Sequence, residues 1–324
     1  MPGMSLLNTP TIEIAHNSFV VLFVLLTPVE RFGFAAVFGL TIGSFLSVVV
    51  YRTPIMLQRL WERELQALTH PTDPATSAPA HTPSDGDATA QRHTSPLRFN
   101  LCVPRSSCTA CGHPIRAWEN IPVLSYALLR GRCSACGTPI GLIYPLLELL
   151  TALLAVLMLW RFGLSWQTLC GFGLGATLLA LGFIDGRTGL LPDAITLPLL
   201  WAGLLINLGH VFTTPESAIV GAAAAYGTLW LVYWAFKLAS GKEGMVYGDF
   251  KLFAALGAWL GWQALPTILL AAAIGGALFG VCAIVLGWRK RDEPLPFGPF
   301  LATAALFMML SNLSIESYLS WPGN

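Results

Sequence analysis

The sequence predicts an all-α polytopic membrane protein of about eight transmembrane helices, with a small cysteine-rich domain inserted after the first helix. Of the 324 residues, 55% are hydrophobic and only 11% are charged, and the mean hydropathy is +0.65. Soluble domains carry about 25% charged residues, so this composition excludes an ordinary soluble domain. Four of the seven cysteines form two matched pairs in one polar segment. We expect membrane lipid around most of the chain and no nucleic acid as a partner.

Apolar runs of about 17 to 25 residues are long enough to cross a bilayer. Glu30 and Arg31 interrupt the first run, and the sixth is short and contains Asp249. The eight candidate spans are 33–51, 143–160, 167–184, 192–210, 217–237, 247–262, 265–288 and 296–313.

The distribution of basic residues predicts the orientation in the membrane. When the eight spans alternate in direction, 15 of the 18 Lys and Arg residues fall on one side. The positive-inside rule makes that side cytoplasmic. The N-terminus lacks the pattern of a cleaved signal peptide, so we expect it to be retained. The prediction is a multi-pass membrane protein with its large loop in the cytoplasm.

Three regions follow from this organisation. Residues 1–51 are an N-terminal segment and the first transmembrane helix, 52–142 a cytoplasmic domain, and 143–324 a helical membrane domain. Within the loop, the apolar positions of 55–69 recur every three or four residues and predict a helix. Residues 70–97 are rich in Pro, Ser, Thr and Ala without apolar periodicity, which predicts a disordered linker.

Two C-x-x-C-G-x-P motifs predict a structural zinc site. Cys108 and Cys111 form one knuckle and Cys133 and Cys136 the other, with 21 residues between them. Each knuckle brings two thiolates together, and two knuckles complete the tetrahedral ligand set that zinc prefers. Four thiolates leave no open position, so His113 is not needed as a ligand. Reduced thiols without metal, or a redox dithiol, are the alternatives.

Acidic residues at the ends of predicted spans are the candidates for chemistry. Asp185, Asp193 and Asp249 all fall at the cytoplasmic face, and Glu148 lies in the second span. Two carboxylates held close together in a partly dry site do not both ionise easily. One then activates water while the other protonates a carbonyl oxygen, which is the chemistry of aspartic proteases.

A structural role is the alternative for each acid. For Asp193, which follows Pro192 and precedes a helical run, N-capping is the favoured interpretation. An ion pair with Arg187, Lys242 or Lys251 is another. For Asp185 and Asp249, placement within membrane spans makes function the default interpretation.

Several blocks of sequence resemble the bacterial type IV prepilin peptidases, a family of intramembrane aspartyl leader peptidases that also N-methylate their products. The resemblance runs from about Gly43 to Ala302, without the linker. The blocks are GSFLSVVVYRTP (43–54), RAWENIPVLSY (116–126) between the knuckles, YPLLELLTALL (144–154), FIDGRTGLLPDAITLPLLW (183–201), EGMVYGDFKLFAALGAWLGWQALP (243–266) and PFGPFLA (296–302).

This resemblance implies an activity, a site and a location. The catalytic pair of the family falls on Asp185 and Asp249, whereas the position of Asp193 is usually not catalytic. Such enzymes cut type IV prepilins and type II secretion pseudopilins at the cytoplasmic face of the bacterial inner membrane. They then methylate the new N-terminal residue with S-adenosylmethionine. The cofactor-binding residues are unknown; the knuckle region and Glu148 are candidates by resemblance alone.

The chain departs from the family pattern at three positions. Val246 replaces the first glycine of G-x-G-D, Ser47 replaces the usual asparagine, and Ile143 an arginine. A β-branched residue disfavours positive φ, so we expect Val246 to alter the loop before Asp249. Lys251 is expected to point away from Asp249 and to reach toward the membrane surface.

Three other functions stay open from the sequence. An ion-coupled transporter would carry its acids near the middle of the membrane and would show inverted repeats, and neither feature is evident. A family member impaired by Val246 would act as a methyltransferase alone or as an assembly scaffold.

Overall fold

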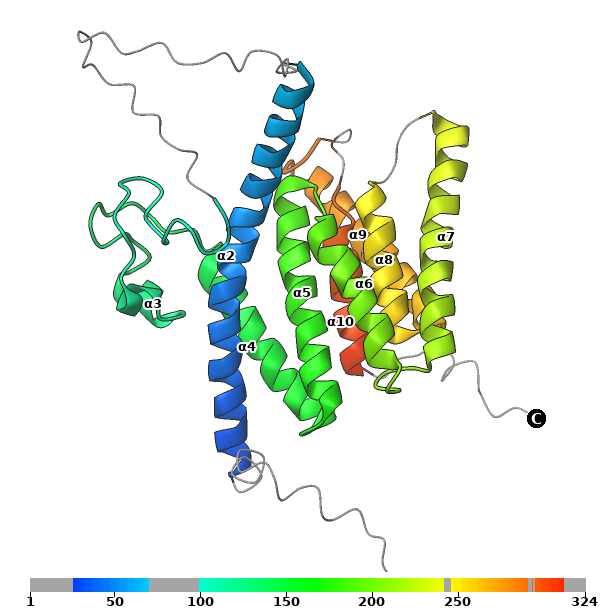
Figure 1. The fold of residues 1–324 in the computed structure, drawn as a ribbon, viewed down its shortest axis with the longest axis horizontal. Helices are drawn as coiled ribbons and strands as arrows, with labels where there is room; N and C mark the ends of the chain where they lie inside the picture. The colour runs from blue at the N-terminus through cyan, green and yellow to red at the C-terminus, as the bar shows by residue number, and fades with distance from the viewer. Residues whose placement is uncertain (1–25, 70–98, 242–245, 291–292, 294, 312–324) are drawn as a thin grey trace, which may run out of the picture.

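The computed structural model describes residues 26–69, 99–241, 246–290, 293 and 295–311. Within these ranges the chain is helical and forms no strands, only two isolated bridges. Each of the eight predicted spans corresponds to one helix (Figure 1). These are α2 (Pro28–Thr69), α4 (Ile143–Phe162), α5 (Trp166–Thr188), α6 (Asp193–Asn207), α7 (Pro215–Ser240), α8 (Tyr247–Leu260), α9 (Leu265–Val285) and α10 (Gly298–Ser311).

Five helical segments are long and apolar enough to cross a membrane on their own. They are α2, α4, α5, α7 and the segment Trp262–Val285, which joins a short 3-10 turn to α9. The apolar helices α6 and α10 are shorter, and α8 has only 14 residues. The all-helical membrane fold is therefore confirmed, with three of its helices shorter than the other five.

Helix α2 is 42 residues long and continues through Pro54. It joins the predicted first span and the predicted helix 55–69 into one element. Gly39 and Gly43 let the backbone of α4 approach closely, because an added Cβ at Gly39 would lie 2.6 Å from Cα of Ala152. The predicted linker 70–97 lies outside the described residues. So do the first 25 residues, which were expected to be retained rather than cleaved.

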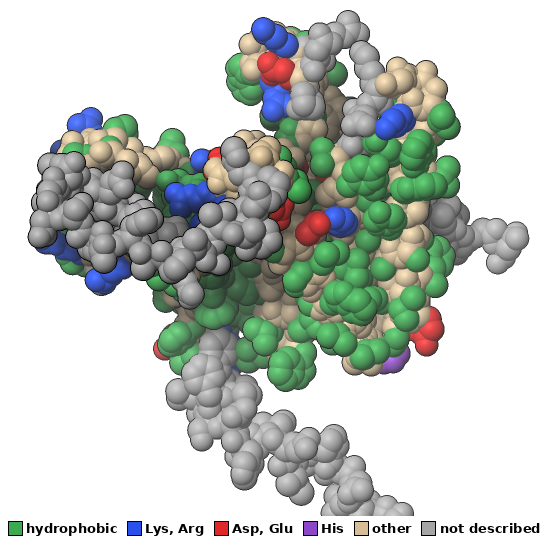
Figure 2. All heavy atoms as spheres, turned by 45° about the horizontal axis from the view of Figure 1, so that its top comes forward, with side chains coloured by type: hydrophobic (Ala, Val, Ile, Leu, Met, Phe, Trp, Pro, Cys, Tyr) green, Lys and Arg blue, Asp and Glu red, His purple; other side chains and the backbone are tan. Residues whose placement is uncertain are grey.

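The outer surface of the helices is apolar, as a lipid-facing surface must be. Large side chains such as Trp160, Leu231 and Leu278 are more than 60% exposed. Figure 2 shows hydrophobic side chains covering the helices, whereas most visible Lys and Arg side chains lie on the cysteine-rich part and toward one end of the helices.

Helix α8 lies between α6 and α7 and is buried along most of its length. Gly221 of α7 and Gly257 of α8 place these two backbones in direct contact. Gly203 of α6 lies against the indole of Trp259, whose Nε1 donates a 2.8 Å hydrogen bond to the Leu199 carbonyl. Small residues permit this close packing, which the hydrophobic effect does not drive within lipid.

One buried asparagine completes the packing at the end of α8. Asn207 is fully buried, and its Nδ2 donates to the carbonyls of Ala258 (2.8 Å) and Trp259 (2.9 Å). Its Oδ1 accepts from the backbone N–H groups of Phe212 and Thr213. The side chain thus joins the last turns of α6 and α8 to the following loop.

We expect Asn207→Leu to destabilise the fold. The substitution removes four hydrogen bonds, and each buried group left unpaired costs about 1–3 kcal/mol. The melting temperature in detergent should fall by at least about 5 °C. An unchanged melting temperature would show that the loop does not depend on this side chain.

Candidate functional site

Asp185 and Asp249 meet at one end of the helix bundle. Asp185 lies in the last turn of α5 and Asp249 in the first turn of α8. Their residues are 4% and 5% exposed, and their carboxylates are close enough to interact electrostatically. The sequence placed both at one membrane face but did not show that they are neighbours.

A backbone donor from a third helix holds Asp185. The N–H of Gly298, the first residue of α10, donates a 2.9 Å hydrogen bond to Asp185 Oδ2. A Cβ at Gly298 would lie 2.6 Å from the same oxygen, so any larger residue there would push the carboxylate of Asp185 out of its place. The sequence did not predict this role for Gly298. Gly298 lies in the PFGPFLA block (296–302), which indicated the family resemblance but not a contact with Asp185.

Asp249 presents a free oxygen inside this site. Its Oδ1 is buried and has no hydrogen-bond partner among the described residues. A buried polar atom of this kind needs a partner such as water or a substrate group. Asp185 therefore has a fixed hydrogen-bond donor, the Gly298 N–H, whereas Asp249 Oδ1 is available to accept or donate a hydrogen bond.

The turn before Asp249 is not strained by valine. Val246 has φ −94° and ψ 143°, an extended conformation that suits a β-branched residue. The expectation that Val246 would alter this loop through positive φ is therefore wrong. Gly248 is the residue that needs to be small, because an added Cβ would lie 2.8 Å from Cβ of Leu191 in the loop between α5 and α6.

Asp193 and Lys251 form an ion pair across two helices. Lys251 Nζ lies 2.7 Å from Asp193 Oδ1 and 2.6 Å from Oδ2. The N-cap position of α6 is Pro192, and no side chain caps the helix there. The predicted N-cap role of Asp193 is therefore wrong, and the ion pair with Lys251, one of the alternatives offered by the sequence, is the contact that the structure shows. The pair joins the first residue of α6 to the N-terminal half of α8.

The four predicted cysteine ligands come together in residues 99–141, here called the cysteine module. The Sγ atoms of Cys108, Cys111, Cys133 and Cys136 all lie within 4.8 Å of one another. Cys108 and Cys136 Sγ are 3.8 Å apart, which is about the spacing of two sulfurs bound tetrahedrally to one zinc ion at 2.3 Å. The cluster therefore fits a four-coordinate metal.

The two knuckles have the same backbone geometry. Gly112 and Gly137 follow the second cysteine of each pair with φ of 72° and 71°. In each knuckle the glycine N–H donates to the carbonyl of the first cysteine, at 2.9 and 3.0 Å. Positive φ is readily available to glycine, which explains its place in both motifs.

Hydrogen bonds around the cluster favour thiolate at two ligands: the backbone at Cys111 lowers the pKa of Cys108. Contacts from the side chain and the backbone of Thr138 lower the pKa of Cys136 to about 6. His113 is not part of the cluster; its Nε2 lies 3.9 Å from Glu119 Oε2. The backbone N–H of Arg116 donates to the same carboxylate and lowers the pKa of Glu119.

Two buried charged residues attach the cysteine module to the helices. Arg52 of α2 donates to the carbonyls of Asn100 (2.8 Å) and Pro104 (2.6 Å). Glu148 of α4 accepts a 2.8 Å hydrogen bond from the N–H of Val123. Glu148, a candidate cofactor residue by resemblance, thus lies where the module meets the membrane helices.

Comparisons with known proteins agree with this geometry. The model of the bacterial peptidase A24 N-terminal domain matches residues 37–162, and that of the type IV leader peptidase family matches 172–281. Proteins named "Prepilin leader peptidase/N-methyltransferase" from Burkholderia pseudomallei (strain 1026b), Aeromonas hydrophila and Pseudomonas putida are 52%, 49% and 48% identical. The alignments cover 84%, 95% and 89% of this chain, and 82%, 97% and 93% of the relatives. No solved structure matches the chain significantly.

We expect Gly298→Ala to slow cleavage of a prepilin substrate strongly, because the new methyl group displaces the Asp185 carboxylate. A displacement of about 1 Å at a reacting group costs roughly 100-fold in rate. Gly227→Ala is the matched control, since a Cβ there meets nothing within 4 Å. Normal cleavage by Gly298→Ala would show that Asp185 does not depend on this contact.

The ion pair gives a second prediction. Asp193→Asn and Lys251→Met should each slow cleavage by about 3- to 10-fold, because either change releases the first turn of α8 from α6. The double variant Asp193→Lys/Lys251→Asp restores opposite charges and should recover a rate within about twofold of wild type. A double variant slower than both single variants would mean that the two side chains act separately.

Proposed function

The chain belongs to the type IV leader peptidase family, and we propose that Asp185 and Asp249 are the two carboxylates with which it cuts its substrates. It is an enzyme that removes the leader of prepilins and N-methylates the residue that becomes the new N-terminus. The observation that supports the assignment is the meeting of these two buried acids at the ends of α5 and α8. Family membership removes the transporter alternative.

The contacts of the two acids suggest different roles. The Gly298 N–H favours negative charge on Asp185, so Asp185 acts as the base that removes a proton from water. Asp249 Oδ1 has no partner in the described part of the chain and acts as the acid that protonates the scissile carbonyl oxygen. The water oxygen then attacks the carbonyl carbon. As the tetrahedral intermediate collapses, the hydroxyl proton returns to Asp249, the C–N bond breaks, and Asp185 gives the proton that it took from water to the leaving amine.

The substrates proposed are type IV prepilins and type II secretion pseudopilins in the bacterial inner membrane. Their apolar helix would lie in lipid against the exposed apolar faces, while a basic leader would stay in the cytoplasm. Placement of the site at one end of the bundle supports a cut at the cytoplasmic face, and the excess of basic residues in the loops supports this orientation.

We assign a structural zinc ion to the cysteine module. Cys108, Cys111, Cys133 and Cys136 would hold it, and the sulfur spacing fits tetrahedral coordination. A zinc ion with four thiolate ligands stabilises a fold and has no open position for a substrate. S-adenosylmethionine is the proposed methyl donor.

Cleavage by purified variants tests the peptidase assignment. Asp185→Asn and Asp249→Asn should each lower the rate at least about 1,000-fold in detergent, because neither amide replaces an acid–base carboxyl group. Melting temperatures show whether the variants stay folded. Substantial cleavage by either variant would falsify the assignment.

The zinc assignment predicts one zinc ion per chain, measured by elemental analysis of the purified protein. Cys111→Ser should lower the zinc content and expose the module to proteolysis, since binding of a structural metal contributes folding free energy. Conversion of Cys282, on α9, to serine is the matched control. A cysteine module without zinc that resists proteolysis as well as wild type would contradict a structural role.

A further inference from the structure

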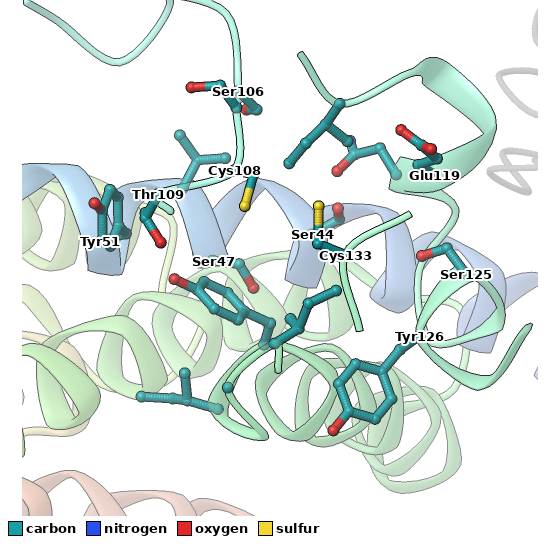
Figure 3. A pocket seen from close by; sticks show the side chains of 18 of the residues that line it. Ser44, Ser47, Tyr51, Ser106, Cys108, Thr109, Glu119, Ser125, Tyr126 and Cys133 are labelled. Atoms are coloured by element: carbon teal, nitrogen blue, oxygen red, sulfur yellow. The ribbon is translucent and has the colours of Figure 1, made fainter. Parts of the chain in front are cut away.

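A cavity of about 690 Å³ lies between the cysteine module and the helices α2 and α4. Figure 3 shows Ser44, Ser47 and Tyr51 of α2 around it. Arg52 and Arg105 also line it, and an apolar helix packed against these charges would remove their hydration without giving them a partner. The apolar helix of a prepilin is therefore expected to bind elsewhere on the chain.

A groove of about 440 Å³, here called the α5–α6 groove, lies between α5 and α6. Helix α6 packs mainly against α8 and makes few contacts with α5, which leaves this space between them. Trp259 of α8 is only 3% exposed and closes the groove on its inner side. On the outer side the groove opens to the lipid-facing surface, where Gly173 and Ala194 are exposed. Its lining includes Gly173 and Thr177 of α5, Ala194, Pro198 and Ala202 of α6, and Trp259.

The lining of the groove is apolar, and many of its residues are small. Ala194, Pro198 and Ala202 recur every four residues, so they form one stripe along α6. The Thr177 hydroxyl donates a 2.8 Å hydrogen bond to the Gly173 carbonyl, and no charged side chain of the described residues lines the groove. Small residues let the backbone of a second helix approach closely within lipid. The groove therefore suits an apolar helix that lies along α6, and it does not suit a polar ligand.

The groove leads to the aspartate pair. Helices α5 and α6 lie side by side and are joined by only four residues, 189–192 (Figure 1). The last turn of α5, with Asp185, and the first turn of α6, with Ala194, are therefore at the same end of the bundle. From Ala194 the lining continues to Ile206 near the other end of α6, about 18 Å away at about 1.5 Å per residue. A helix that fills the groove thus has one end at the level of the aspartates and the rest along the apolar bundle.

We infer that the α5–α6 groove binds the apolar helix of the prepilin and so presents the bond at the N-terminal end of that helix to Asp185 and Asp249. The inference rests on the peptidase activity stated under "Proposed function" and adds to it the surface that selects the substrate. Its support is the continuity of the groove with the aspartate site, together with the apolar lining. An acyl chain and a second copy of this chain are the alternative occupants, and neither needs a groove that ends at the aspartates.

Filling the groove tests the inference, with the full chain in a lipid bilayer. Gly173→Leu places a side chain in the groove, and the fold accommodates it because an added Cβ at Gly173 meets nothing within 4 Å. Gly173→Leu and Ala194→Leu should each raise the KM for prepilin at least about tenfold and change kcat by less than about threefold, because binding of the helix is lost rather than the chemistry. Gly227→Leu on α7 is the matched control, since a Cβ there also meets nothing within 4 Å, and it should leave the KM within about twofold.

Photocrosslinking identifies the occupant of the groove. With benzoylphenylalanine at position 173 and Asp249→Asn to keep the substrate uncut, the chain should crosslink to the apolar helix of prepilin, whereas the same group at position 227 should not. A KM within about twofold of wild type in both groove variants, or crosslinks from position 173 to lipid or to a second copy alone, would overturn the inference and leave the peptidase assignment intact. A wild type that cuts no prepilin would overturn the proposed function and the inference with it. Melting temperatures identify a variant that fails to fold, and the other variant then decides.

Discussion

Burial of two carboxylates in an apolar helix bundle is the constraint on which the rest of the structure depends. A charged group in hydrocarbon is costly unless it lies at the membrane face and finds partners. Asp185 and Asp249 satisfy this condition, because they occupy the end of α5 and the beginning of α8 and because Gly298 donates to one of them. Three helices far apart in the sequence therefore have to meet at one point, and the packing of the bundle serves that meeting.

The position of α8 is determined at both of its ends. Near the aspartates, the Asp193–Lys251 ion pair joins α8 to α6. At the other end, Asn207 hydrogen-bonds the last carbonyls of α8. Between these points, Gly221 and Gly257 bring α7 and α8 into backbone contact. A short helix held in this way keeps Asp249 in place, although only 14 residues form it.

A few buried polar contacts also position the cysteine module. The side chains of Arg52 on α2 and Glu148 on α4 bind backbone groups of the module. A metal ion bound by the four thiolates would make the module rigid. The cavity enclosed by these contacts lies beside α5, which also carries Asp185. Helix α5 thus carries Asp185 at the aspartate site and Arg187 in the lining of the cavity.

The sequence by itself determined the helical membrane fold, the four-cysteine cluster and the identity of the candidate acids, because composition, hydrophobic length and motif spacing are local properties of the chain. Tertiary structure decided the remainder. The contact of Gly298 with Asp185 spans more than a hundred residues and has no local signal. The sequence offered Lys251 as one of three basic partners for the acids, and only the packing of α6 against α8 selects it for Asp193. The extended backbone of Val246 also depends on how α8 is held. The cavity beside the cysteine module is lined by α2, α4, α5 and the module, which come together only in the folded chain.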